Sequence, residues 1–211
     1  MDDTIRATAD VECLVSLLRR AHSALDVTVR ALTLSTGPGT ERSMASLGRT
    51  LRELHSGSAE LATAALGVLP EQPDRSSVLT ALYVSEDAGR IAVLLGQAGE
   101  ILQARSSGPP PAERVLVPLR ELGGATLGLV TRAQDVLRSA APPAVMDSGL
   151  AEITARQRGL ERLLLADTCD PALLADAADA AVLGRCYEEC AFRVAAVARI
   201  GALRIERRGQ P

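Results

Sequence analysis

The stretch from Val182 to Arg199 reads VLGRCYEECAFRVAAVAR, and a related stretch, VSEDAGRIAVLLGQA, runs from Val84 to Ala98. When Gly89 is placed opposite Glu188, core-type residues fall at matching positions in steps of three and four, the spacing of one helix face. The matched pairs are Val84 with Leu183, Ala88 with Tyr187, Ile91 with Cys190, Leu95 with Val194 and Ala98 with Val197. The two stretches therefore predict equivalent helices in two related halves of the chain.

The amino-acid composition favours an all-α fold. The 211-residue chain contains one Phe, two Tyr and no Trp, so its core must be built from Leu, Val, Ala and Ile. These residues suit the packing of helix on helix, whereas β-sheet domains rely more on aromatic residues and Thr. The length allows one large domain or two small ones.

Turn-forming residues divide the chain into six predicted helices. They run from Thr8 to Leu34, Glu41 to Val68, Asp74 or Ser76 to Arg105, Ala112 to Ser139, Val145 to Ala166, and Pro171 to Arg207. Asp170 before Pro171 is the clearest start signal, because Asp caps a helix and Pro fits its first turn. Pro118 and the pair Gly123-Gly124 predict a bend or a loosened turn in the fourth helix. Glycines inside helical patterns, at positions 89, 96, 99, 123, 124 and 128, indicate close packing.

The proline-rich segment from Ser106 to Pro111 cannot continue a helix and predicts a break between two groups of three helices. We expect three-helix units over residues 1–106 and 112–211, joined by a linker over residues 107–111. Short connections imply antiparallel neighbours, so the expected architecture is a tandem pair of antiparallel three-helix bundles. Small residues predict that the third and sixth helices form the central seam. These residues are Ala88, Ala92, Ala98, Ala191, Ala195 and Ala198.

Charge and hydropathy argue against two classes of partner. The net charge is −3, which argues against nucleic acid because its binders usually carry a basic surplus. No run approaches the roughly 18 apolar residues that cross a bilayer, and the first residues lack the pattern of a secretory signal. We therefore expect a cytoplasmic protein without membrane insertion.

Catalytic and metal-binding patterns are weak. The sequence has no recognisable Ser, His and Asp arrangement, no Gly-rich phosphate loop before a helix, and no Glu-x-x-His pattern of di-iron bundles, so we expect no enzyme. Cys186 and Cys190 lie four residues apart on one predicted helix face. Their spacing favours small residues at a tight helix contact. A metal or redox role is the alternative, and it requires further ligands.

The two matched stretches resemble the signatures of the PhoU family, bacterial regulators of phosphate transport and phosphate signalling. The second family signature usually reads Arg-Tyr-Leu-Glu-Arg-Ile-Gly-Asp-His, and in residues 185–193 Arg185 and Glu188 match it while Tyr187 is a conservative replacement. The first, Asp-Leu-Glu-Arg-Ile-Gly-Asp, is matched by Asp87, Arg90 and Ile91. The segment Asp74-Arg75 resembles the family's Asp-Leu-Arg. The resemblance covers nearly the whole chain in organisation, with residue matches confined to these helices.

The resemblance implies a Glu and an Asp four residues apart in each half, as ligands for metal ions. This sequence has Gly89 and Val93 at the first pair and Glu188 and Phe192 at the second. One carboxylate of four binds a divalent ion weakly, so we expect no metal and no cofactor. Glu188 is expected to be solvated or paired with Arg185. Val93 and Phe192, with Leu95 or Val194, either form an apolar surface patch that contacts a protein or join the core.

By resemblance, we expect a non-catalytic regulator that binds the ATPase of a phosphate ABC transporter or a sensor histidine kinase, favouring repression when phosphate is plentiful. The expected contact residues are Asp87, Arg90, Arg185, Glu188, Phe192 and Arg193. The alternatives are a metal- or redox-responsive sensor that uses Cys186 and Cys190, a PhoU paralogue whose partner is unrelated to phosphate, and a structural homodimer.

Overall fold

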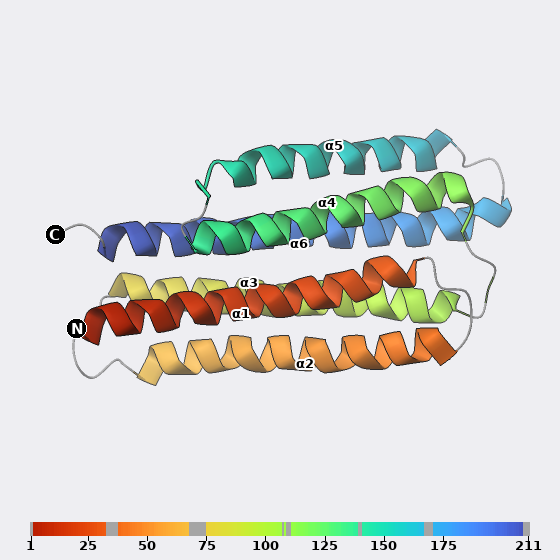
Figure 1. The fold of residues 1–211 in the computed structure, drawn as a ribbon. Coiled ribbons are helices and arrows are strands. Elements are labelled where there is room, and N and C mark those ends of the chain that lie inside the picture. Colours follow the sequence, from red (N-terminus) through yellow and green to blue (C-terminus); the bar gives the residue numbers. More distant parts are fainter. Residues whose placement is uncertain are drawn as a thin grey trace.

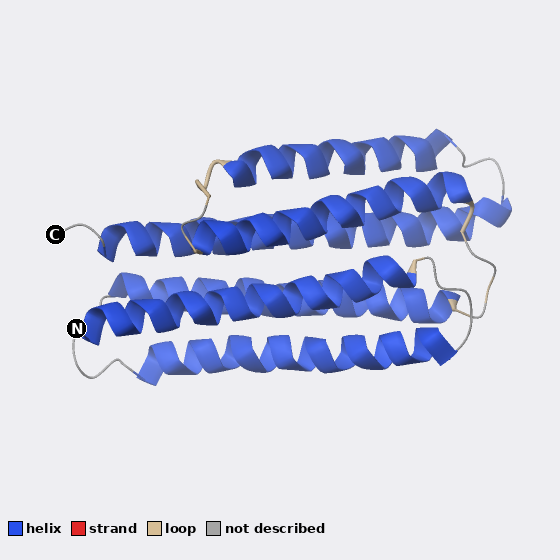
Figure 2. Ribbon diagram, in the orientation of Figure 1, coloured by secondary structure: helices blue, strands red, loops and turns tan. Residues whose placement is uncertain are grey.

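The computed structural model describes residues 2–32, 38–67, 75–106, 108, 111–138, 141–166 and 171–208. Within these ranges the chain forms six helices and no strand, which confirms the predicted all-α fold (Figures 1 and 2). The helices are α1 (Asp2–Ala31), α2 (Pro38–Gly67), α3 (Arg75–Arg105), α4 (Glu113–Leu137), α5 (Val145–Ala166) and α6 (Pro171–Arg208). None of these helices has the length and hydropathy that a membrane span requires.

Two groups of three helices lie side by side. In the first group α1, α2 and α3 all contact one another. In the second group α4, α5 and α6 also all contact one another. Across the boundary α3 packs against α6 and α1 against α4. Successive helices run in opposite directions, with α2 and α5 at the two outer edges (Figure 1). The packing is consistent with tandem helical bundles.

Several predicted helix boundaries agree with the structure. α5 has the predicted bounds, Val145–Ala166, and α6 begins at the predicted Pro171. α4 continues from Glu113 to Leu137 through Pro118 and both glycines without interruption. Pro118 removes one backbone donor from this helix, but its neighbours Val115 and Leu119 are buried and anchor the turn. Ser76 lies inside α3, while the possible caps Asp74 and Asp170 fall outside the described residues.

The inner faces of α3 and α6 form the centre of the core. All ten residues matched between the two sequence stretches are at most 3% exposed, which confirms the predicted helix faces. The six alanines predicted for the seam are also buried. α3 and α6 contact each other along this side, as expected.

Close helix contacts explain some of the helical glycines. A Cβ atom on Gly123 would lie 2.6 Å from Cγ2 of Val29 on α1 and 3.4 Å from Cε2 of Tyr187 on α6. Gly123 therefore lets α4 approach both helices, and Gly99 plays a similar part between α3 and α2. Gly124 has open space beyond its Cα, so the prediction of close packing is wrong at this position.

We expect opposite effects from alanine at these two adjacent positions of α4. Gly123→Ala lowers the free energy of unfolding by about 1 to 3 kcal/mol, because the added methyl overlaps Val29. Gly124→Ala raises it by about 0.5 to 1 kcal/mol, because alanine favours the helix and meets no neighbour. Urea denaturation followed by circular dichroism measures both changes. Equal effects at the two positions would contradict the packing of α4 against α1.

Candidate functional site

α3 and α6 share one open side of the molecule. α3 contacts α1, α2 and α6, whereas α6 contacts α3, α4 and α5 and touches α1. Both lie behind α1 and α4 in Figure 1, with α2 and α5 at the edges, so their remaining sides face the same way. We name the solvent-facing residues of α3 and α6 on this side the seam face.

Exposed apolar residues concentrate on the seam face. Among the described side chains, seven of the ten exposed large apolar residues belong to α3 and α6, whereas α1 and α4 on the opposite side contribute only Val117. The seven are Leu79, Tyr83, Val93, Leu174, Val182, Phe192 and Leu203. Their spacing along each helix repeats in whole turns, so they lie on one side of it.

The sequence left two alternatives, a surface patch or the core, for four apolar residues, and the structure places two of them in each. Val93 is 47% exposed and Phe192 is 43% exposed, so both lie on the surface. Leu95 and Val194 are buried in the core. The surface alternative therefore holds for the two positions where the PhoU resemblance implies carboxylates, and the core alternative holds for the other two.

An ion pair joins the two bundles beside the seam face. Nη1 of Arg193 on α6 donates to Oδ1 of Asp87 on α3 at 3.1 Å, and Nη2 donates to Oε1 of Glu189 at 2.7 Å. Burial raises the pKa of Asp87, with a smaller rise from Glu86 and Glu189, while Arg193 opposes the rise. Arg193 is therefore the group that stabilises the charge of the buried Asp87.

The other predicted contact residues lie on α6 and α3 without joining this pair. Nη1 of Arg185 donates to Oε2 of Glu188 at 2.7 Å, which confirms the predicted pairing. Glu188 is buried, whereas Arg185 is exposed. Arg90 is exposed on α3 and lies close enough to Cys186 to influence its pKa. The structure thus forms two pairs from the predicted contact residues, Asp87 with Arg193 and Arg185 with Glu188, and leaves Arg90 and Phe192 outside both pairs.

The residues at the four implied metal positions do not fit a metal cluster. Val93 and Phe192 offer no ligand atom, Gly89 has no side chain, and Glu188 already accepts a hydrogen bond from Arg185. Within the described part of the chain, no group of three His, Cys, Asp or Glu side chains is placed to hold a metal ion.

Cys186 and Cys190 are free thiols directed into the core of the protein. Burial raises the pKa of both thiols, and Arg90 only partly opposes the rise at Cys186. Metals and oxidants react with the thiolate, which burial disfavours here. The geometry therefore supports the packing role of this pair over the sensor role.

Sequence reasoning did not predict the pair of Asp87 with Arg193, and it also missed a second ion pair between the bundles. Arg105, at the end of α3, donates to Oδ2 of Asp179 at 2.7 Å and also to Asp176, both near the start of α6. No local pattern indicates this contact, because more than 70 residues separate the partners. Glu189, by contrast, lies four residues before Arg193, and that spacing on a helix was a readable signal.

Comparison with known proteins finds no matching family model and no matching curated protein. The resemblance to the PhoU family therefore rests on the residues quoted from the sequence.

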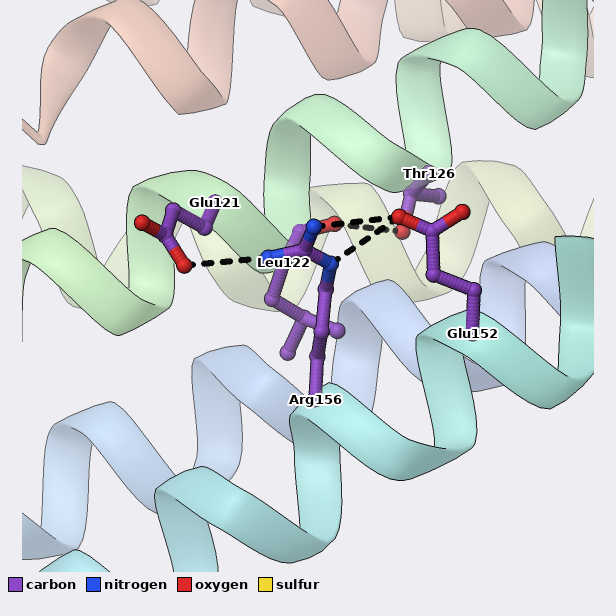
Figure 3. Close-up of polar contacts among 5 residues, drawn as sticks. All are labelled: Glu121, Leu122, Thr126, Glu152 and Arg156. Atoms are coloured by element: carbon purple, nitrogen blue, oxygen red, sulfur yellow. Dashed lines mark hydrogen bonds and ion pairs between the residues drawn. The ribbon is translucent and has the colours of Figure 1, made fainter.

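An exposed ion pair elsewhere offers a control for Arg193. Arg156 on α5 bonds to Glu152, four residues earlier, and to Glu121 on α4, at 3.1 and 3.0 Å (Figure 3). The Arg156 side chain is 38% exposed and that of Arg193 is 37%. The carboxylate on the neighbouring helix differs, because Glu121 is 58% exposed and Asp87 only 11%.

We expect Arg193→Met to lower the free energy of unfolding by about 1 to 3 kcal/mol, because Asp87 is left buried without its partner. The matched Arg156→Met costs about 0.5 kcal/mol or less, because exposed ion pairs contribute little. Adding Asp87→Asn to Arg193→Met restores most of the lost stability. Urea denaturation measures all three, and equal losses at Arg193 and Arg156 would contradict the burial of Asp87.

The raised pKa of Asp87 predicts a pH dependence. The folded protein holds the pKa of Asp87 above its ordinary value of 3.8, so the stability that this shift adds is fully present below pH 3.8 and is lost as the pH rises through the folded pKa. We expect Asp87→Asn to match the unmodified protein in acid and to be at least as stable near neutral pH. The measurement is urea denaturation at a series of pH values. A variant that is less stable only near neutral pH would show that Arg193 outweighs burial.

Proposed function

We propose that this protein is a non-catalytic regulator of the PhoU type that binds a protein partner through the seam face. The concentration of exposed apolar side chains on this face carries the proposal, since the opposite face exposes only Val117 among its described large apolar residues. Apolar patches on the surface of a soluble protein often mark a binding site. The proposed action is preferential binding to one conformation of the partner.

Three groups of residues supply the chemistry of the proposed contact. Phe192 and Val93 act as apolar anchors, because both are exposed at the middle of their helices. Arg90 and Arg185 act as charged contacts around them. Arg193, through its bond to Asp87, fixes α6 relative to α3 and so sets the spacing of the two anchors. Interfaces are typically built from such aromatic and Arg contacts around a desolvated centre.

The partners suggested by the resemblance are the ATPase of a phosphate ABC transporter and a sensor histidine kinase. Both present surfaces in the cytoplasm, so the proposal includes a cytoplasmic location. Under the proposal, the protein binds the repressed conformation more tightly than the active one, since only differential affinity shifts such an equilibrium.

Affinity purification from cells of the source organism, grown at high and at low phosphate, tests the proposal. We expect the transporter ATPase or the kinase to be recovered, with more recovered at high phosphate. The double variant Val93→Ser with Phe192→Ser loses about tenfold or more of the partner, as expected when interface anchors are removed. Leu165→Ser on α5, a residue that is 72% exposed, is the control and leaves recovery unchanged.

Two results would contradict this proposal in different ways. Recovery of neither component at either phosphate level would contradict the phosphate assignment. Equal recovery by the double variant and the unmodified protein would contradict the seam face as the binding surface. A different partner that depends on Val93 and Phe192 would indicate a regulator of another process.

A further inference from the structure

The seam face exposes charges of both signs on α3. Exposed residues of this helix recur every three or four positions and form one row along it, which includes Glu86, Arg90, Val93 and Glu100. Glu86, Arg90 and Glu100 form no ion pair with the described residues. The row therefore combines an apolar side chain with carboxylates and a guanidinium that have no charged partner within the described part of the chain.

Ion pairs between α3 and α6 show which residues of these antiparallel helices lie at the same level. Asp87 bonds to Arg193, and Arg105 bonds to both Asp176 and Asp179. Because the two helices run in opposite directions, a step forward along α3 corresponds to a step backward along α6 (Figure 1). These contacts therefore fix the level of every residue on one helix relative to the other.

At corresponding levels, the seam face of α6 carries charges opposite to those of α3. Arg90 lies within one turn of the level of Glu189, and Glu100 lies within about one turn of the level of Arg185. No ion pair joins the described residues of α3 and α6 at either level. The side chains of Arg185 and Glu189 are 71% and 36% exposed, so each can still bind a further charge.

Apolar residues correspond in the same way. Leu79 on α3 lies near the level of Leu203 on α6, and both are exposed. Val93 and Phe192 are exposed near the middle of the two helices. Each charged or apolar side chain of the α3 row thus finds a suitable contact at its own level on α6.

A two-fold axis parallel to α3 and α6 brings these matching residues together between two copies of the chain. Rotation about this axis exchanges the two sides of the face and keeps every residue at its own level. Arg90 then meets Glu189 of the second copy, and Glu100 meets Arg185 of the second copy. Each contact occurs twice, as in any two-fold interface. The paired α3 and α6 helices form a four-helix bundle in which all neighbours are antiparallel.

The seam face also has the area that a dimer requires. The exposed row on α3 runs from Leu79 to Ala104, which corresponds to roughly 38 Å at 1.5 Å per residue. Two adjacent helices, each about 10 Å wide, then present a face of roughly 750 Å². Specific protein interfaces typically bury about 800 Å² on each partner.

We propose that the seam face of a second copy of the chain covers the seam face when no regulatory partner is bound. The regulatory part of this inference rests on the proposed function, because the second copy and the partner then compete for Val93 and Phe192. The partner binds the monomer and shifts the equilibrium away from the dimer. Self-association therefore sets how much of the protein is available to the partner.

Sedimentation equilibrium of the full chain at a series of protein concentrations tests the inference. We expect a dimer that dissociates into monomers on dilution. Val93→Ser with Phe192→Ser raises the dissociation constant of the dimer by about tenfold or more, because both anchors are lost from each copy. Leu165→Ser on α5, which is exposed away from the seam face, leaves the dissociation constant unchanged.

A charge swap tests the register of the two copies. Arg90→Glu with Glu100→Arg keeps the net charge, yet both positions then face like charges in the second copy. We expect the dissociation constant of the dimer to rise by about tenfold or more. The matched swap Glu12→Arg with Arg19→Glu, at exposed positions of α1, leaves it unchanged. All four positions are exposed, so the helical content measured by circular dichroism stays the same.

Three results would each overturn the inference: a monomer at every concentration, a dimer that the Val93 and Phe192 double variant leaves intact, or equal effects of the two charge swaps. A dimer that behaves as expected, while cells yield no regulatory partner, would support the dimer and contradict the proposed function. A monomeric chain that recovers its partner through Val93 and Phe192 would support the proposed function and contradict the dimer.

Discussion

The packing of α3 against α6 is the contact on which the rest of the structure depends. It brings the two groups of three helices together and buries the matched residues of both helices. Each fully buried Leu or Val contributes about 1.5 to 3 kcal/mol, so these inner faces are a substantial part of the core that stabilises the protein. Because both helices are anchored on their inner sides, their outer sides are held facing the same way. A continuous external surface results, built from two segments about a hundred residues apart in the chain.

The ion pairs across this contact have a different role from the apolar core, because they position the two helices. A buried pair such as Asp87 with Arg193 loses hydration on both partners, and this cost offsets much of the attraction. Its clearest effect is on geometry, since a shift of α6 along α3 would leave Asp87 buried without a partner. Arg105 with Asp176 and Asp179 imposes a similar condition at one end of the same pair of helices. Together these contacts fix the spacing between Val93 and Phe192, on which the proposed binding surface depends.

The sequence was sufficient where the deciding signals are local. Pro171 set the start of α6, and the repeating apolar spacing identified the inner faces of α3 and α6. The pairing of Glu188 with Arg185 followed from their spacing on one helix.

Three-dimensional packing decided what the sequence left open. Gly123 and Gly124 are adjacent, yet only the first faces α1, because successive residues point in directions about 100° apart. Val93 lies on the surface and Leu95 in the core for the same reason.

The most direct test of the account is hydroxyl-radical footprinting of the protein with and without its recovered partner. The account predicts protection of Tyr83 and Phe192 with Leu66 on α2 and Leu165 on α5 unchanged, and protection of Leu66 and Leu165 alone would contradict it.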